Sequence, residues 1–185
     1  MLSLYTVCFF GHRRIDDIIS VETSVENVID KVLRQHEYVE FLVGRDGEFD
    51  QIVSSAVLQY KKRSDAGNCS LTWVMPYMKS EYAHNRENYD SYYDSVEVCE
   101  QSDMAHPKSA IQIRNRAIVD RSDLCVFYVC KKVGGAYQTM KYAANQGKDM
   151  PREKDRYGYY KIHKQIRSKH SYSFEVCPRI EKSRS

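Results

Sequence analysis

The stretch YVEFLVGRDGEFD, residues 38–50, joins an apolar run to a turn with two glycines and then to the start of an amphipathic pattern. The apolar run ends at Gly44, and from Phe49 to Tyr60 apolar residues return at helical spacing. An apolar run of this kind, here with Glu40 as its one charged residue, is typical of a buried strand in a parallel sheet, and the second pattern is typical of a helix with one buried side. This stretch therefore predicts a buried parallel strand, a short turn and a helix over about 49–63.

The same order of strand, turn and helix recurs along the chain. We expect further strands at 5–10, 70–75 and 124–129, a short strand at 95–99, and helices at about 21–36, 82–94, 108–121 and 136–147. Ser20 or Thr23 is expected to cap the first of these helices. The alternation predicts an α/β fold, a Rossmann-like three-layer sandwich with a mainly parallel sheet. The carboxyl ends of its strands would then share one edge, where ligands bind in sheets of this kind.

The pattern stops at Gly147, and we expect a domain over 1–147 and a separate extension over 148–185. The extension holds 11 Lys and Arg against 5 Asp and Glu, a net charge of +6, whereas 1–147 holds 17 against 20, a net charge of −3. The extension has no buried apolar run, so we expect it to be poorly ordered or to form a loosely packed helix around 157–168.

The composition narrows the class of protein. Hydrophobic residues make up 42% and charged residues 29% of the chain, which is ordinary for a globular domain. No apolar run approaches the roughly 20 residues that span a bilayer, and the first residues do not resemble a signal peptide. None of the six cysteines forms a CxxC pair, and no histidines accompany them at zinc spacing. We therefore expect a cytoplasmic protein with reduced cysteines, no membrane contact, no metal and no cofactor.

Three turns that follow predicted strands carry the candidate binding residues. Glycine turns at the start of a helix expose backbone N–H groups, and the helix dipole adds attraction for an anion. Cationic side chains beside them would neutralise phosphate. For each turn taken alone, a plain strand-to-helix connection remains the alternative. The turn residues predicted to bind a ligand are Gly11, His12, Arg13, Gly44, Gly47, Gly134, Gly135 and Thr139.

The helix before the last predicted strand contributes one more candidate, Arg114. Arg114 and Arg116 cannot share a face of that helix, so at most one of them can point into the site. The alternative is a solvated helix face. Tyr77 would stack on a base or cover the sheet edge, and the tyrosines at 82, 89, 92 and 93 would form packing or a lid.

The ordered set of these motifs resembles a known family. FFGHR at 9–13, the turn from Gly44 to Asp50, VMPY at 74–77, Arg114-Asn115, and GGAYQT at 134–139 occur in the order typical of the SLOG superfamily, in its YspA/YpsA-like branch of bacterial-type proteins. The resemblance covers about residues 5–147. It implies a Rossmann-like domain that binds nucleotides or nucleotide-derived ligands at its strand ends, with a role in stress or phage conflict.

The resemblance also bears on catalysis. Relatives include phosphoribohydrolases that use an arginine and the glutamate of a PGGxGTxxE motif. Arg114 takes the place of that arginine, and the resemblance makes it the candidate catalytic residue. Lys141 or Tyr142 stands where the glutamate belongs, so the family mechanism lacks its acid unless Glu48 or Asp50 supplies one.

The sequence thus favours binding or sensing of a nucleotide or phosphosugar-type small molecule. The first alternative is an enzyme that cleaves N-glycosides, a phosphoribohydrolase-like hydrolase. The second is a nucleic-acid-binding module, supported by the basic extension alone and disfavoured by the mildly acidic body. A homodimer stays open, because no interface can be recognised in the sequence.

Overall fold

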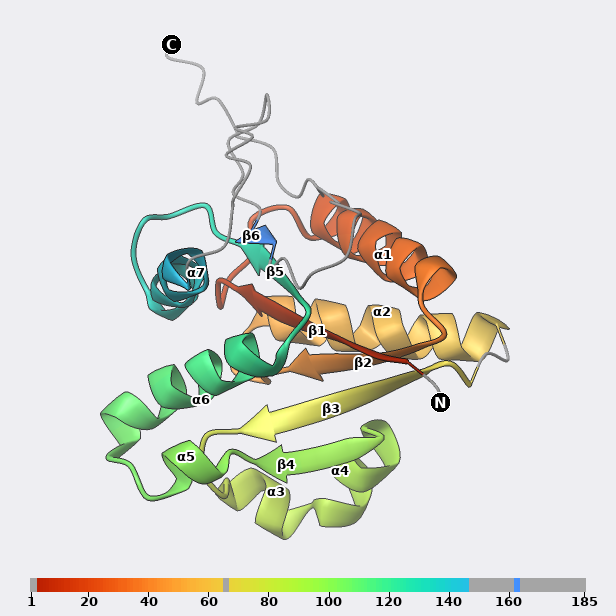
Figure 1. Cartoon of the computed structure of the whole chain (residues 1–185). Helices are drawn as coiled ribbons and strands as arrows, with labels where there is room; N and C mark the ends of the chain where they lie inside the picture. The colour runs from red at the N-terminus through yellow and green to blue at the C-terminus, as the bar shows by residue number, and fades with distance from the viewer. Residues whose placement is uncertain (1–2, 65–66, 147–161, 164–185) are drawn as a thin grey trace.

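The computed structural model describes residues 3–64, 67–146 and 162–163, and its centre is one twisted sheet (Figure 1). The strand order is β4-β3-β2-β1-β5-β6. Five strands run parallel, and the short β6 pairs antiparallel with β5. The strands are β1 Leu4–Gly11, β2 Tyr38–Val43, β3 Cys69–Met75, β4 Ser95–Val98, β5 Leu124–Tyr128 and β6 Ile162–His163.

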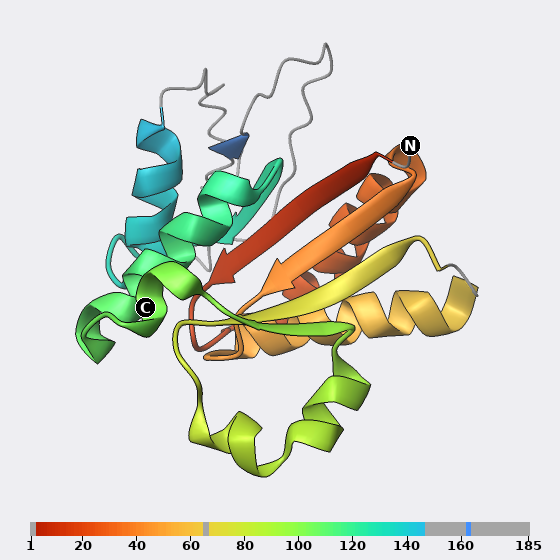
Figure 2. The same cartoon turned by 60° about the horizontal axis from the view of Figure 1, so that its bottom comes forward.

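Helices cover both faces of this sheet, so the α/β three-layer prediction is confirmed. Helices α1 and α2 pack together on one face, and α6 and α7 pack together on the other (Figures 1 and 2). The helices are α1 Ile18–Gln35, α2 Glu48–Ser64, α3 Ser80–His84, α4 Arg86–Tyr92, α5 Glu100–Asp103, α6 Pro107–Arg121 and α7 Gly135–Asn145.

The two faces of each strand explain the apolar runs. Side chains alternate across a strand, so neighbouring residues enter different layers. Val7 and Phe9 of β1 pack in the core beneath α1 and α2, whereas Cys8 and Phe10 pack in the core beneath α6 and α7. In a strand that is buried on both faces, successive side chains all enter a core. This is why β1 is a nearly continuous hydrophobic run in the sequence.

The strand order reverses beside β1. Strands β1 to β4 follow one another in one direction, and β5 then lies on the opposite side of β1. The chain leaves β1 toward the face that carries α1, and it leaves β5 toward the face that carries α7. Because these two connections leave the sheet toward opposite faces, a crevice opens between the ends of β1 and β5. Such a crevice is the usual ligand site of sheets of this kind.

Two helix predictions need correction. The first helix begins at Ile18, and its cap is Asp17 rather than Ser20 or Thr23, because the Asp17 carboxylate accepts a hydrogen bond from the backbone N–H of Ser20 at 3.1 Å. The single helix expected over 82–94 is two short helices, α3 and α4, that join at Asn85.

The tyrosines of this segment pack around the single tryptophan, which confirms their role as packing residues. Trp73 is 1% exposed, and its ring lies 5.8 Å from that of Tyr82, 5.1 Å from Tyr89 and 5.5 Å from Tyr93. The guanidinium of Arg45 lies 4.8 Å from the Tyr89 ring. Aromatic contacts of this kind stabilise the α3–α4 segment against β3 and β4.

The extension after Gly147 is described at two residues only. Ile162 and His163 form β6 on the edge of β5, so the expected helix around 157–168 is wrong at these positions. The remainder of that expectation, and the domain boundary itself, lie outside the described residues. Within the described ranges, no helix combines the length and the apolar character needed to cross a bilayer.

Candidate functional site

A cavity of about 370 Å³ lies at the point where the strand order reverses. It is bounded by the turn after β1, the turn after β2, the inner face of α6 and the amino end of α7. Its lining residues are Phe10, Gly11, His12, Arg13, Asp46, Gly47, Asp50, Ile111, Arg114, Asn115, Gly134, Gly135 and Ala136.

The cavity brings together most of the residues that the sequence singled out. The turns after β1, β2 and β5 all reach it, as does the face of α6 that carries Arg114. Arg116 does not line the cavity, and its guanidinium lies 5.2 Å from the ring of Tyr142 instead. Of the predicted residues, those in the lining are Gly11, His12, Arg13, Gly47, Arg114, Gly134 and Gly135, and those outside it are Gly44 and Thr139.

Several of these glycines are needed for close packing between protein groups. A Cβ at Gly11 would lie 2.3 Å from the ring of Phe49. A Cβ at Gly44 would lie 2.9 Å from Nη1 of Arg114 and 3.0 Å from Oδ2 of Asp50. The glycine at the end of β2 therefore makes room for a guanidinium and a carboxyl group, and that is why Gly44 matters although it does not line the cavity.

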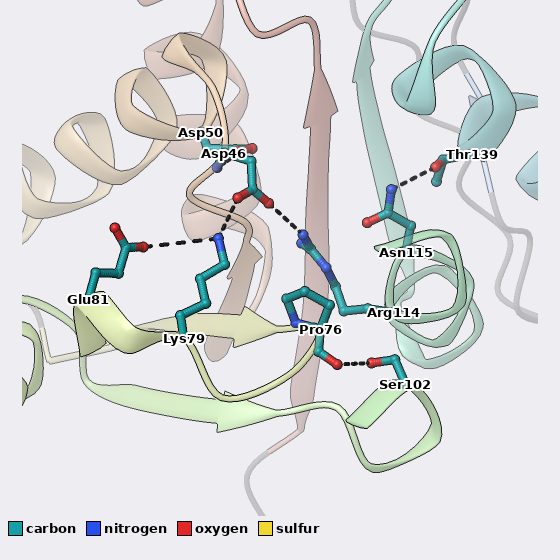
Figure 3. Close-up of polar contacts among 9 residues, drawn as sticks. All are labelled: Asp46, Asp50, Pro76, Lys79, Glu81, Ser102, Arg114, Asn115 and Thr139. Atoms are coloured by element: carbon teal, nitrogen blue, oxygen red, sulfur yellow. Dashed lines mark hydrogen bonds and ion pairs between the residues drawn. The ribbon is translucent and has the colours of Figure 1, made fainter. Parts of the chain in front are cut away.

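Arg114 is the centre of a buried charge network. The residue is 3% exposed, and its Nη2 donates to Oδ2 of Asp46 at 3.0 Å. The other carboxylate oxygen of Asp46 accepts from the ammonium of Lys79. Figure 3 shows Arg114 extending from α6 and Lys79 from the segment after β3, so that both side chains meet at Asp46. The network thus ties the β2–α2 turn to α6 across the end of the sheet.

The pKa values of the two carboxyl groups in the cavity wall, those of Asp46 and Asp50, are shifted in opposite directions. Burial raises the pKa of Asp50 to about 6, although the charge of Arg114 and hydrogen bonds from the backbone of Asp46 and Gly47 oppose the rise. Burial acts on Asp46 in the same direction, but the hydrogen bond and charge of Lys79, with the charge of Arg114, lower the pKa of Asp46 below its usual value. Asp46 is therefore ionised at neutral pH. The carboxyl group of Asp50, by contrast, loses its proton at about pH 6, close to neutral pH.

The raised pKa of Asp50 predicts how stability depends on pH. The folded protein holds this proton more tightly than the unfolded chain, so the stability is fully present below about pH 4 and falls as pH rises through about 6. We expect Asp50→Asn to raise the free energy of unfolding by about 1–3 kcal/mol at pH 8 and to leave it unchanged near pH 4. Urea unfolding of both proteins at the two pH values measures this difference.

The matched control for this prediction is Glu48→Gln, two residues earlier in the same helix. The Glu48 carboxylate accepts from the backbone N–H of Ile15 at 2.7 Å and does not line the cavity. Its glutamine variant keeps an acceptor there, so it should show no gain at pH 8. A gain of equal size in both variants would contradict the assignment of the pH dependence to Asp50.

His12 holds the turn after β5. Its Nε2 accepts hydrogen bonds from the backbone N–H groups of Cys130 at 3.0 Å and Lys131 at 3.1 Å. An accepting Nε2 requires the neutral ring, and burial together with the charge of Lys131 lowers the pKa of His12 accordingly. His12 therefore positions the β5–α7 turn, and only its Nδ1–H side is free to donate.

Thr139 supports α6 instead of facing the cavity. Its hydroxyl accepts from Nδ2 of Asn115 at 3.0 Å (Figure 3). The same hydroxyl donates to the carbonyl of Gly135 at 2.9 Å. Asn115 and Gly135 both line the cavity, so Thr139 positions two lining residues without lining the cavity itself. The expected contact between this hydroxyl and an anion is not made by the observed orientation.

Sequence reasoning gave no role to Asp46 or Lys79, and it named Asp50 only as an alternative acid. Asp46 sits between the two glycines of a turn, where an aspartate is an ordinary turn residue. Lys79 lies two residues after the VMPY motif at the end of β3 and is not part of it. These residues are close to one another in the folded protein, but they come from segments far apart in the sequence. A rule based on spacing along the chain therefore cannot detect the link.

The fold and the cavity define an α/β protein with a Rossmann-like sheet and, at its switch point, a cavity whose wall carries charged side chains. No model of a known protein family matches the chain, and no curated protein is similar to it. The described residues contain no group of three or more His, Cys, Asp or Glu side chains suited to a metal ion.

Proposed function

We propose that this protein binds a nucleotide or nucleotide-derived ligand in the cavity between the ends of β1 and β5. The observation that carries the proposal is that the β1–α1 turn with Arg13 and the amino end of α7 line the same cavity. Backbone N–H groups at a helix start and a guanidinium together form a favourable site for phosphate. The SLOG resemblance points to the same ligand class.

The distribution of charge around the cavity supports an orientation of the ligand in which its phosphate lies near Arg13. Inside the cavity wall, Arg114 is already paired with Asp46. Arg13 lines the cavity and is exposed, and Arg14, Lys131 and Lys132 are exposed residues of the turns that follow β1 and β5. A phosphate would bind beside Arg13, and the uncharged part of the ligand would enter the wall region around Arg114. The volume of about 370 Å³ falls in the range of small-molecule sites.

Calorimetry with the four common nucleoside 5′-monophosphates tests the proposal. We expect Arg13→Ala to weaken the best of them about tenfold, because a hydrogen bond to a charged group contributes about 1.5–3 kcal/mol. Arg34→Ala, an exposed change on α1, is the control and should bind like the unaltered protein. Chromatography of the same mixtures detects free base, which would indicate the N-glycoside-cleaving alternative.

The proposal fails if none of these nucleotides binds and if mass spectrometry finds no phosphorylated small molecule that co-purifies with the protein. It also fails if a nucleotide binds equally well to the Arg13→Ala variant and to the Arg34→Ala control.

A further inference from the structure

The side-chain oxygen of Asn115 is an accessible acceptor in the cavity wall. Asn115 is 6% exposed and lines the cavity. Its amide nitrogen donates to Thr139, but among the described residues no group donates to Oδ1. The partnerless side-chain atoms that are covered completely are Oδ1 of Asn68 and Nε of Arg114, and Oδ1 of Asn115 is not one of them. This oxygen therefore keeps accessible surface, and a ligand in the cavity can donate to it.

The orientation of the Asn115 amide is fixed by its neighbours. The Thr139 hydroxyl has a single hydrogen, which it donates to the carbonyl of Gly135 at 2.9 Å. It can therefore only accept from Asn115, so the atom that faces it at 3.0 Å is Nδ2. Figure 3 shows the oxygen of Asn115 pointing away from Thr139, on the side of Arg114. Thr139 is thus a positioning residue that holds the acceptor in place before a ligand binds.

Asn115 is much more buried than Arg13, although both line the same cavity. In the proposed function the phosphate binds beside the exposed Arg13. The base lies at the opposite end of a nucleotide from its phosphate, with the sugar between them, so the base is the part that reaches a buried acceptor. A phosphate would not bind at Asn115, because its oxygens are acceptors and would face the carbonyl oxygen without a hydrogen between them.

We propose that Asn115 determines the base specificity of the site: its Oδ1 accepts a hydrogen bond from an exocyclic amino group of the ligand's base. This inference rests on the proposed function and specifies its ligand as a nucleotide with an amino base, such as cytosine or adenine. A carbonyl group at the same ring carbon, as in uracil or hypoxanthine, would place two acceptors against each other. A buried acceptor left without a donor is costly, so the oxo bases bind more weakly.

Calorimetry at pH 7 with two matched pairs of 5′-monophosphates measures this selectivity. Cytidine is compared with uridine, and adenosine with inosine. The members of each pair carry an amino or a carbonyl group at the same ring carbon, with the matching change at the adjacent ring nitrogen. In the pair that binds more tightly, we expect the amino nucleotide to bind about tenfold more tightly than the oxo nucleotide, because only the amino group satisfies the acceptor.

Two leucine variants on α6 assign the selectivity to its source. Asn115→Leu removes the acceptor and keeps a side chain of similar size, so the gap within the pair should fall to about twofold or less. Gln112→Leu removes the other amide side chain of this helix, which does not line the cavity, and should keep the full gap. Circular dichroism and thermal unfolding establish that each variant is folded before binding is compared.

The outcomes separate this inference from the proposed function. Equal binding of amino and oxo nucleotides to the unaltered protein, with Arg13→Ala still weakening both, overturns the contact with the base and leaves phosphate binding intact. Tighter binding of the oxo nucleotides also overturns it, because the amide nitrogen would then have to face the cavity. These two results do not depend on the folding of any Asn115 variant. A full gap in folded Asn115→Leu overturns the role of Asn115, and failure of every nucleotide to bind overturns the inference together with the proposed function.

Discussion

Arg114→Met is expected to lower the free energy of unfolding by about 3–5 kcal/mol at pH 8, because it removes the guanidinium beside the Asp50 carboxylate and one of the two cations paired with Asp46. Arg114 is 3% exposed and its guanidinium joins α6 to the β2–α2 turn, so water cannot replace it fully. Chemical denaturation followed by circular dichroism measures the loss. At this size the loss is a large fraction of the stability of an ordinary domain.

Two further variants establish the cause of the loss. Arg116→Met removes the same group two residues away, on an exposed position of the same helix, and should cost under 1 kcal/mol. Adding Asp50→Asn to Arg114→Met removes the carboxylate that has lost its neighbouring cation, and we expect it to restore about 1–3 kcal/mol. If Arg114→Met were as stable as Arg116→Met, the charge network would not hold the sheet edge together.

Gly11→Ala is expected to destabilise the protein by about 3 kcal/mol, because the added methyl group would enter the ring of Phe49. The nearest ring atoms would lie 2.3 and 2.4 Å from the new Cβ, and Phe49 is 1% exposed with its ring stacked on that of Tyr128 at 5.6 Å. A ring that is buried and stacked in this way cannot move aside without disturbing the core. Thermal and urea unfolding measure the loss.

Gly67→Ala is the control, because a Cβ there meets no atom within 4 Å. We expect no loss from it, and a gain of a few tenths of a kcal/mol is consistent with the reduced freedom of the unfolded chain. Replacing Phe49 by Leu in the Gly11→Ala protein should recover part of the loss, since the smaller side chain leaves room for the methyl group. Additive losses in the double variant would show that the glycine is required for a reason other than this contact.

The predictions from sequence succeeded where short-range patterns carry the information. The apolar run at β2 ends at Val43 and the helical pattern of α2 begins at Glu48, both as expected to within a residue. The cap of α1 was wrong because Ser, Thr and Asp compete for that position, and the local backbone selected Asp17. The two short helices between β3 and β4 were predicted as one helix. The reason is that the tyrosines of this segment pack on Trp73 and do not follow a single helical stripe.

The candidate site divides in the same way. Its glycines and cationic residues follow strands, and parallel strands place their carboxyl ends together, so the sequence placed Arg13, Gly47 and Gly134 at one edge. The roles of the side chains could not be read in this manner. His12 was expected to contact a ligand, and it accepts from backbone N–H groups through Nε2. Thr139 was expected to meet an anion, and it bonds to Asn115.

The sequence by itself determined the layers of this protein and the edge where its turns meet, because hydrophobic periodicity and chain connectivity are local properties. Only the tertiary structure decided which charges face each other. Arg114, Asp46, Asp50 and Lys79 come from three separate segments, and their pairing depends on burial that no single segment possesses. Electrostatic energies depend on distance and on the exclusion of water, and both exist only after the segments have packed together.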